Sequence, residues 1–177
     1  MRRIIFIFTF LVAFNVNAND GLYVVAGLGK GEVDVGPDFQ VNNVKESNDT
    51  FDYQVLLGYR FTNKLQIEAG HMSHGSLDIF GLADHSSMAE NVILLGYGIN
   101  LTPKIKITPR VGYSFWEFES TEGWVLNAGP EKRHKKEDQE LIYTISASYS
   151  NLYISYQSVD YDFGELNSLM VGLELDL

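Results

Sequence analysis

Strict alternation of side-chain type constrains this chain more than any other feature of its sequence. From position 51 to position 61 every odd residue is apolar or aromatic, while the even positions carry Asp52, Gln54, Leu56, Gly58 and Arg60. Successive side chains of a β-strand point to opposite faces, so this pattern predicts a strand with two unlike faces. It recurs at 65–70, 105–115, 141–149 and 169–177, and more weakly at 22–28, 89–101 and 152–156. We therefore predict an all-β fold of eight strands.

The connections between these segments alternate between short and long. Residues 62–64, 102–104 and 150–151 form tight turns, whereas the other links run from about 30 to 50, 74 to 87, 117 to 139 and 159 to 167. An even number of antiparallel strands with short turns at one end and long loops at the other predicts an up-and-down β-barrel.

Size, charge and cysteine content exclude several classes of protein. A chain of 177 residues is long enough for one domain with a substantial core. Its 13 basic against 23 acidic residues give a formal charge of -10, which excludes a basic nucleic-acid-binding surface. The sequence contains no Cys, so disulfides, thiolate metal sites and cysteine nucleophiles are excluded.

The first 18 residues have the pattern of a cleaved secretory signal. Arg2 and Arg3 precede an apolar run at 4–14, and the small-residue pattern Val16-Asn17-Ala18 follows. The apolar run is shorter than the roughly 20 residues that a membrane-spanning helix needs. We expect cleavage after Ala18 and export by the general secretory route, which leaves residues 19–177 as a barrel domain.

The composition of the polar face predicts which face is outside. It carries mainly Gly and Ser with few charges, whereas a water-facing surface would be about a quarter to a third charged. Small residues suit the crowded interior of an eight-stranded barrel. The apolar face carries two bands of Tyr and Phe, as membrane interfaces favour. We therefore predict a transmembrane β-barrel; the alternative is a soluble secreted barrel that binds a ligand in its lumen.

Several segments carry a family resemblance. They are the segments 22–29 (LYVVAGLG), 57–61 (LGYRF), 65–70 (LQIEAG) and 109–113 (PRVGY), together with the alternating C-terminal strand. These segments resemble the small eight-stranded outer-membrane β-barrel proteins of Gram-negative bacteria, of the porin-like or surface-antigen type. The resemblance implies an outer-membrane location and a final strand that the barrel-assembly machinery reads. Family members usually end in Phe, and here the last residue is Leu177. We expect a monomer with a structural or surface-interaction role and no enzymatic activity.

The inward face is expected to hold a plug of ion pairs. The charged residues on this face are Arg60, Glu68, Glu90, Lys106, Arg110 and Glu174. A charge in a narrow lumen is costly without a counter-charge, so we predict a mixed network, with Glu68 and Arg110 paired at mid-barrel. The alternative for the same residues is a gated pathway for small ions.

A histidine-rich region suggests an enzymatic alternative. His71 and Ser73 lie on the outward face and resemble the His-x-Ser element of outer-membrane lipid A deacylases, in which the His activates a lipid-facing Ser. In those enzymes an Asn follows the Ser, and here His74 stands in its place. The nearest carboxylate on the next strand, Glu90, falls on the opposite face, which leaves the triad incomplete.

The same region offers one alternative metal site. His71, His74 and His85 could ligate a transition metal, although a strand that continues through His74 would point this residue away from His71. We expect no metal and no cofactor.

A basic run lies in the third long link, at 130–138. The run contains Lys132, Arg133, Lys135 and Lys136, which could contact lipopolysaccharide phosphates or an anionic host ligand, although such a run is usually a solvated loop. The other long links are acidic. The expected partners are outer-membrane lipid and lipopolysaccharide, and no nucleic acid.

Overall fold

The computed structural model describes residues 21–35, 47–75, 85–121, 133–162 and 164–177. All of its regular elements are strands: β1 (Gly21–Val35), β2 (Ser47–Arg60), β3 (Leu65–Gly75), β4 (His85–Tyr97), β5 (Ile99–Asn100), β6 (Ile105–Thr121), β7 (Arg133–Tyr149), β8 (Leu152–Tyr161) and β9 (Gly164–Asp176). The predicted signal segment, 1–18, lies outside the described residues, as do 36–46, 76–84, 122–132 and 163 in the long links.

These nine labels describe eight barrel strands. β4 pairs with β6 up to Gly96 and Arg110, and the two-residue β5 pairs with the same strand in the same register, Ile99 with Ile107. β4 and β5 are therefore one strand with a break at Gly98, and the prediction of eight strands is confirmed.

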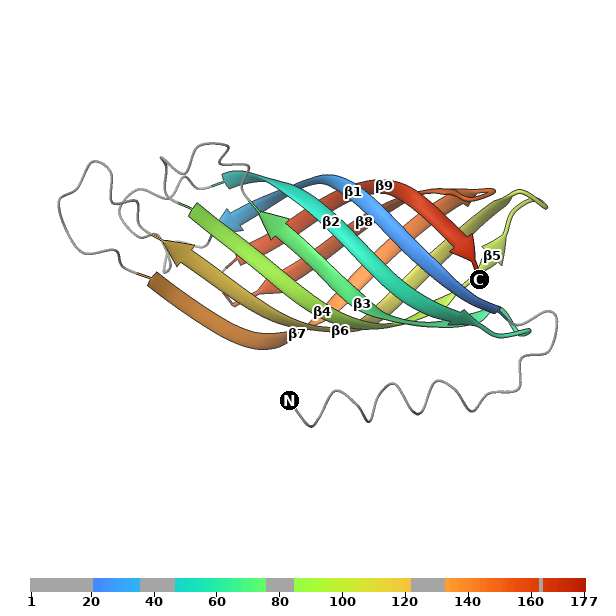
Figure 1. Ribbon diagram of the computed structural model, residues 1–177, viewed down its shortest axis with the longest axis horizontal. Helices are drawn as coiled ribbons and strands as arrows, with labels where there is room; N and C mark the ends of the chain where they lie inside the picture. Colours follow the sequence, from blue (N-terminus) through green and yellow to red (C-terminus); the bar gives the residue numbers. More distant parts are fainter. Residues whose placement is uncertain (1–20, 36–46, 76–84, 122–132, 163) are drawn as a thin grey trace.

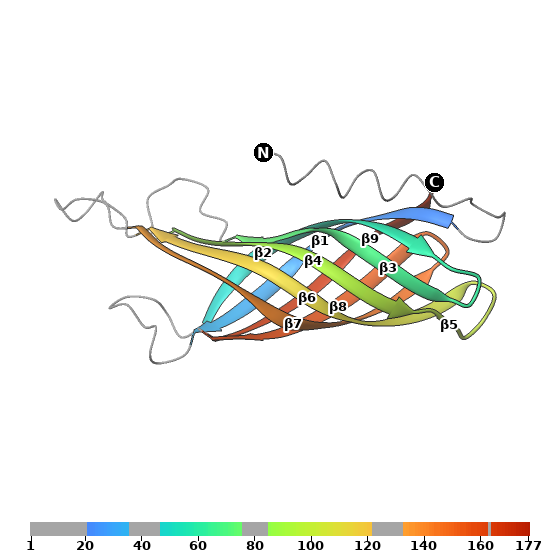
Figure 2. The ribbon, with the colours of Figure 1, turned by 90° about the horizontal axis from the view of Figure 1, so that it is seen from below.

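The sheet closes on itself. Consecutive strands pair antiparallel, and β1 also pairs with β9 from Tyr23↔Asp176 to Val35↔Gly164, so the first and last strands complete a barrel. Figures 1 and 2 show the strands tilted around the long axis, with the short turns and the C-terminus at one end and the strand ends that flank the long links at the other. Closure leaves no bare strand edge within the lipid, where no water could satisfy it.

The tight turns predicted at 62–64, 102–104 and 150–151 are confirmed, and they set the registers of three hairpins. Gly58 is opposite Glu68, Gly96 is opposite Arg110, and Ser146 is opposite Ser155. Because a slip of one residue would exchange the two faces of a strand, these registers fix which side chains enter the lumen.

The apolar face is outside. Tyr53, Ile93 and Val171 are 40–59% exposed, whereas Ser114 and Ser146 on the other face are at most 4% exposed. An isolated barrel in water would not expose a continuous apolar belt of this kind, and lipid provides the matching environment. The soluble ligand-binding alternative finds no support. Among the described residues, no helix has the length and hydrophobicity needed to cross a bilayer.

Several strands extend further than the sequence predicted. The third long link was expected to span 117–139, but β6 continues to Thr121 and β7 begins at Arg133, and these two residues still pair. The first long link was expected to span about 30 to 50, but β1 continues to Val35 and β2 begins at Ser47. Alternation indicates a strand only where one face is apolar, so it does not distinguish the charged strand segments beyond the lipid belt from loops.

Candidate functional site

The predicted mid-barrel ion pair is present. Arg110 Nε lies 2.7 Å from Glu68 Oε2, and both side chains are buried. Ser146 accepts a hydrogen bond of 2.7 Å from Arg110, and Tyr23 donates one of 2.5 Å to Glu68. Removing either charge would leave the other buried without its partner, which is the costly case for a buried pair.

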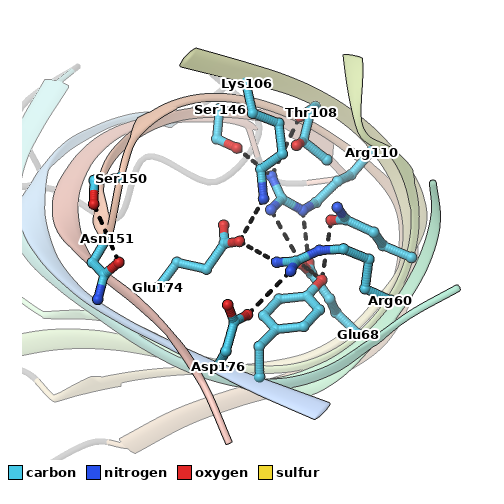
Figure 3. A network of polar contacts seen from close by, with 12 residues as sticks. Arg60, Glu68, Lys106, Thr108, Arg110, Ser146, Ser150, Asn151, Glu174 and Asp176 are labelled. Atoms are coloured by element: carbon cyan, nitrogen blue, oxygen red, sulfur yellow. Dashed lines mark hydrogen bonds and ion pairs between the residues drawn. The ribbon is translucent and has the colours of Figure 1, made fainter. Parts of the chain in front are cut away.

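A second cluster lies at the short-turn mouth of the lumen. Arg60 and Lys106 both contact the carboxylate of Glu174, and Arg60 Nη1 also lies 3.0 Å from Asp176 Oδ1. Figure 3 looks along the lumen and shows Glu174 reaching toward Lys106 and Arg60, with Asp176 beside them. The guanidinium of Arg60 is also stacked over the ring of Tyr23, which connects this cluster to the mid-barrel pair.

Apolar side chains fill the lumen beyond these charges. Four apolar side chains on the inward face are at most 2% exposed: Val25, Leu56, Met72 and Leu94. The residues that alternate with them along each strand face the lipid. A cavity that Leu56, Met72 and Arg110 help to line has a volume of about 10 Å³, no more than one water molecule requires. The described part of the lumen is thus plugged rather than open.

Glu90 belongs to a different cluster from the one predicted. His74 Nε2 lies 2.9 Å from Glu90 Oε1, and His74 Nδ1 lies 3.0 Å from Asp52 Oδ1. All three side chains are fully buried. We call the set Asp52, His74 and Glu90 the upper triad. The alternation of side chains predicts an inward direction for Asp52, but no motif in the sequence marks this residue as part of a site.

Hydroxyl and amide groups complete the upper triad. Asp52 accepts hydrogen bonds from Thr50 and Ser168. Glu90 accepts them from Ser114, Gln157 and Tyr161 at 2.6, 3.3 and 2.7 Å. The signal that could have revealed this cluster is the inward position of His74 in a strand that continues to Gly75.

The described residues do not assemble a hydrolytic triad around Ser73. His71 and Ser73 share the outward face, but the ring of His71 contacts Asn91, with its Nδ1 3.3 Å from Asn91 Oδ1. Glu90, the carboxylate considered for this role, points into the lumen and bonds His74. Nothing in this arrangement favours the lipid A deacylase alternative.

The histidines do not converge on a metal. β3 continues through His74, so His71 faces outward and His74 faces the lumen. His85 begins β4, and its side chain lies outside the described part. No group of three potential ligand side chains suited to a metal occurs within the described residues.

The predicted basic contact segment is a strand that carries its own counter-charges. Lys135 lies 3.0 Å from Glu117 and 2.7 Å from Glu137, and Lys136 lies 3.2 Å from Asp162. The hydrogen bonds to Glu137 and Glu117 raise the pKa of Lys135 to about 12. The side chain of Arg133 and all of Lys132 lie outside the described residues. The two described lysines thus form intramolecular pairs.

Comparisons with known proteins agree with this architecture. Residues 17–160 match the family model described as OmpA-like transmembrane domain. Neisserial surface protein A has a TM-score of 0.66 at 14% identity, over 89% of this chain and 97% of its own. Ail, the attachment invasion locus protein of Yersinia pestis, has a TM-score of 0.53 at 12% identity, over 89% of this chain and 99% of its own. No curated protein sequence gives a significant match.

Proposed function

Because the chain belongs to the family of OmpA-like transmembrane domains, we propose that this outer-membrane barrel is a non-enzymatic surface protein whose charged strand ends contact cationic partners. The proposal has two parts. The first is that the barrel acts as a rigid scaffold, and the second is that the long-link end provides the contact surface.

The observation that carries the proposal is the length of the β6–β7 hairpin. The outermost outward-facing apolar residues of these strands are Phe115 and Leu141, yet pairing continues to Thr121↔Arg133. Six further residues of strand reach about 20 Å along the strand direction. Paired backbone beyond the lipid belt is a rigid support for contacts outside the membrane.

The charge on this end favours a cationic partner. Among the side chains that the structure describes, the exposed basic ones at this end are Lys30 and Lys135. The exposed acidic ones outnumber them: Glu32, Asp49, Glu117, Glu137, Asp138, Asp160, Asp162 and Glu165. Ail has been crystallised with the heparin analogue sucrose octasulfate, a polyanion. The acidic surface of this chain supports the opposite preference, because like charges repel at close range.

The test compares binding to surfaces of opposite charge. Outer-membrane vesicles that carry the protein are expected to bind immobilised polylysine more strongly than vesicles without it, and heparin no more strongly. The excess binding should weaken as salt is added, because exposed charges are screened. The triple variant E32Q/D160N/E165Q should lose the excess binding severalfold.

A matched control separates this surface from total charge. Asp176 is also exposed but lies at the short-turn end, so Asp176→Asn should leave polylysine binding unchanged. Preferential binding to heparin by the wild type, or equal loss in the triple variant and the control, would contradict the proposal.

A further inference from the structure

An apolar groove crosses the lipid-facing surface of β7, β8 and β9 near the short turns. Ala147 of β7 forms its floor, because a methyl group stands there between the larger outward side chains of Ile145 and Tyr149. Tyr149, Ile154 and Val171 rise around it and are 45–59% exposed. The groove has a volume of about 620 Å³, within the range of roughly 300–1,000 Å³ found for small-molecule sites. Its walls and its place in the lipid belt suit a hydrocarbon chain.

A polar depression of about 510 Å³ lies next to this groove, on the rim of the barrel. Ile105 and Tyr149 line both, so the two hollows adjoin. The turns at 102–104 and 150–151 border the polar one, and the cluster around Glu174 forms its inner side. We call it the rim depression. An apolar hollow beside a charged one matches the two parts of an amphiphilic molecule.

Backbone hydrogen bonds hold the rim depression in shape. The N–H of Ser150 donates to the carbonyl of Lys104 at 3.1 Å, which joins the two turns. The N–H of Glu174 donates to the carbonyl of Asn151 at 2.8 Å, which joins the second turn to β9. Within the first turn, Thr102 Oγ1 accepts the N–H of Lys104 at 3.3 Å. A site that is already formed costs little ordering when a ligand binds.

The rim depression has an excess of positive charge. The charged side chains that line it are Arg60, Lys104 and Lys106 against Glu174 and Asp176. Glu174 pairs with Arg60 and Lys106, and Asp176 pairs with Arg60. Lys104 is exposed, and no carboxylate of a described residue lies within ion-pair distance of it. Its ammonium group is therefore available to an anion that lies beside the groove.

We propose that this surface binds one anionic glycerophospholipid of the inner leaflet, with an acyl chain in the apolar groove and the phosphate against Lys104. Membrane barrels place their short turns in the periplasm, so this end lies in the phospholipid leaflet. Tyr149 stands where the two hollows meet, the headgroup level that aromatic rings favour. A tail joined to a phosphate matches the apolar and the positive hollow in the order in which they occur.

Native mass spectrometry of the detergent-purified barrel measures lipid that remains bound. Titrated with dioleoyl phosphatidylglycerol, the protein should retain one lipid, with an affinity severalfold higher than for dioleoyl phosphatidylcholine. The two lipids have the same tails, but the choline group neutralises the phosphate. Equal retention of the two lipids would overturn the proposal.

A pair of lysine variants tests the anion contact. Lys104→Gln should lower the affinity for phosphatidylglycerol to that for phosphatidylcholine. Lys64→Gln is the matched control, because Lys64 is also exposed in a short turn, but that turn joins β2 and β3 on the side of the barrel opposite the groove. It should bind as the wild type does. Equal losses in the two variants would mean that general attraction, and not this site, selects the lipid.

A pair of alanine variants tests the groove. Ala147→Leu fills the floor and should weaken retention of both lipids severalfold. Ala69→Leu adds the same side chain to an outward position of β3, away from the groove, and should change nothing. Both added side chains face lipid, so both variants are expected to fold, and heat-modifiable mobility checks this. Unchanged retention in folded Ala147→Leu would contradict the groove.

The same spectra separate other occupants of this surface. Glycerol phosphate has the anion without the tails and should not displace the bound lipid, and displacement would refute the part played by the groove. A dimer that Ala147→Leu abolishes would show that a second copy of the chain covers the groove, and would overturn the lipid site. The acidic surface proposed to bind cations lies at the other end of the barrel, so neither set of results depends on the other.

Discussion

At the residue scale, the lumen is packed so closely that one added methyl group would displace a neighbouring side chain. Gly58 faces inward, and a Cβ built there would lie 2.4 Å from Cζ of Tyr23. Tyr23 donates to Glu68 and lies under the guanidinium of Arg60, so its ring position supports both ion-pair clusters near the short-turn end. The absence of a Cβ at Gly58 therefore leaves room for the Tyr23 ring and, through it, supports charged groups that Gly58 does not itself contact.

We predict that Gly58→Ala destabilises the barrel by about 1–3 kcal/mol, because the added methyl group must displace the Tyr23 ring. Urea unfolding in lipid vesicles, followed by tryptophan fluorescence, measures this change. Gly75→Ala on β3 is the control, since a Cβ there meets nothing within 4 Å and should change the stability little. Equal effects of the two substitutions would show that the lumen accommodates the methyl group.

At the element scale, each strand separates two environments. The outward side chains of β9, such as Leu169, Val171 and Leu173, are 45–59% exposed on the lipid side, while Ser168 and Met170 on the inward face are about 1% exposed. The strand tolerates this contrast because its neighbours alternate in the same phase, Val171 being paired with Leu28 on one side and Ile154 on the other. The apolar belt is thus a property of the registered sheet.

We predict that Val171→Arg destabilises the folded barrel by about 2–4 kcal/mol, the cost of a charge near the bilayer midplane. The same urea titration in vesicles provides the measurement. Asp160→Arg, an outward position of β8 near the long-link end, should cost much less because water reaches it. A small effect at Val171 would mean that this position lies outside the apolar belt.

At the scale of the whole molecule, the barrel is closed by its backbone and filled by its side chains. The described charges in the lumen form three clusters. The Glu68–Arg110 pair and the cluster around Glu174 lie toward the short turns, and the upper triad lies toward the long links. Buried apolar residues such as Leu56 and Met72 occupy the space that a water-filled channel would need. This arrangement favours the plugged lumen over the gated ion pathway considered from sequence.

We predict that the purified protein, reconstituted in planar bilayers, shows no steady ion conductance at neutral pH. The physical reason is the cost of moving an ion past buried apolar groups without hydration. Heat-modifiable mobility on a denaturing gel confirms that the reconstituted sample is a closed barrel. Steady conductance from a sample that passes this control would show that the lumen plug is mobile.

The sequence by itself determined the number of strands, their faces and the three tight-turn registers, because an alternating pattern next to a short turn permits only one pairing that keeps apolar residues on one side. It also identified Glu68 and Arg110 as partners, because both lie at similar depth from the short-turn end. It did not determine the extent of the strands beyond the lipid belt, where neither face is apolar.

Only the tertiary structure decided which inward side chains meet across the lumen. Glu90 was grouped with the other charges, yet it bonds His74, whose inward direction depends on β3 continuing to Gly75. Asp52 and Ser168 are 116 positions apart in the sequence and meet because closure places β9 and β2 on either side of β1. Strand tilt and closure set the height of each side chain in the barrel, and these are properties of the complete sheet rather than of any one segment.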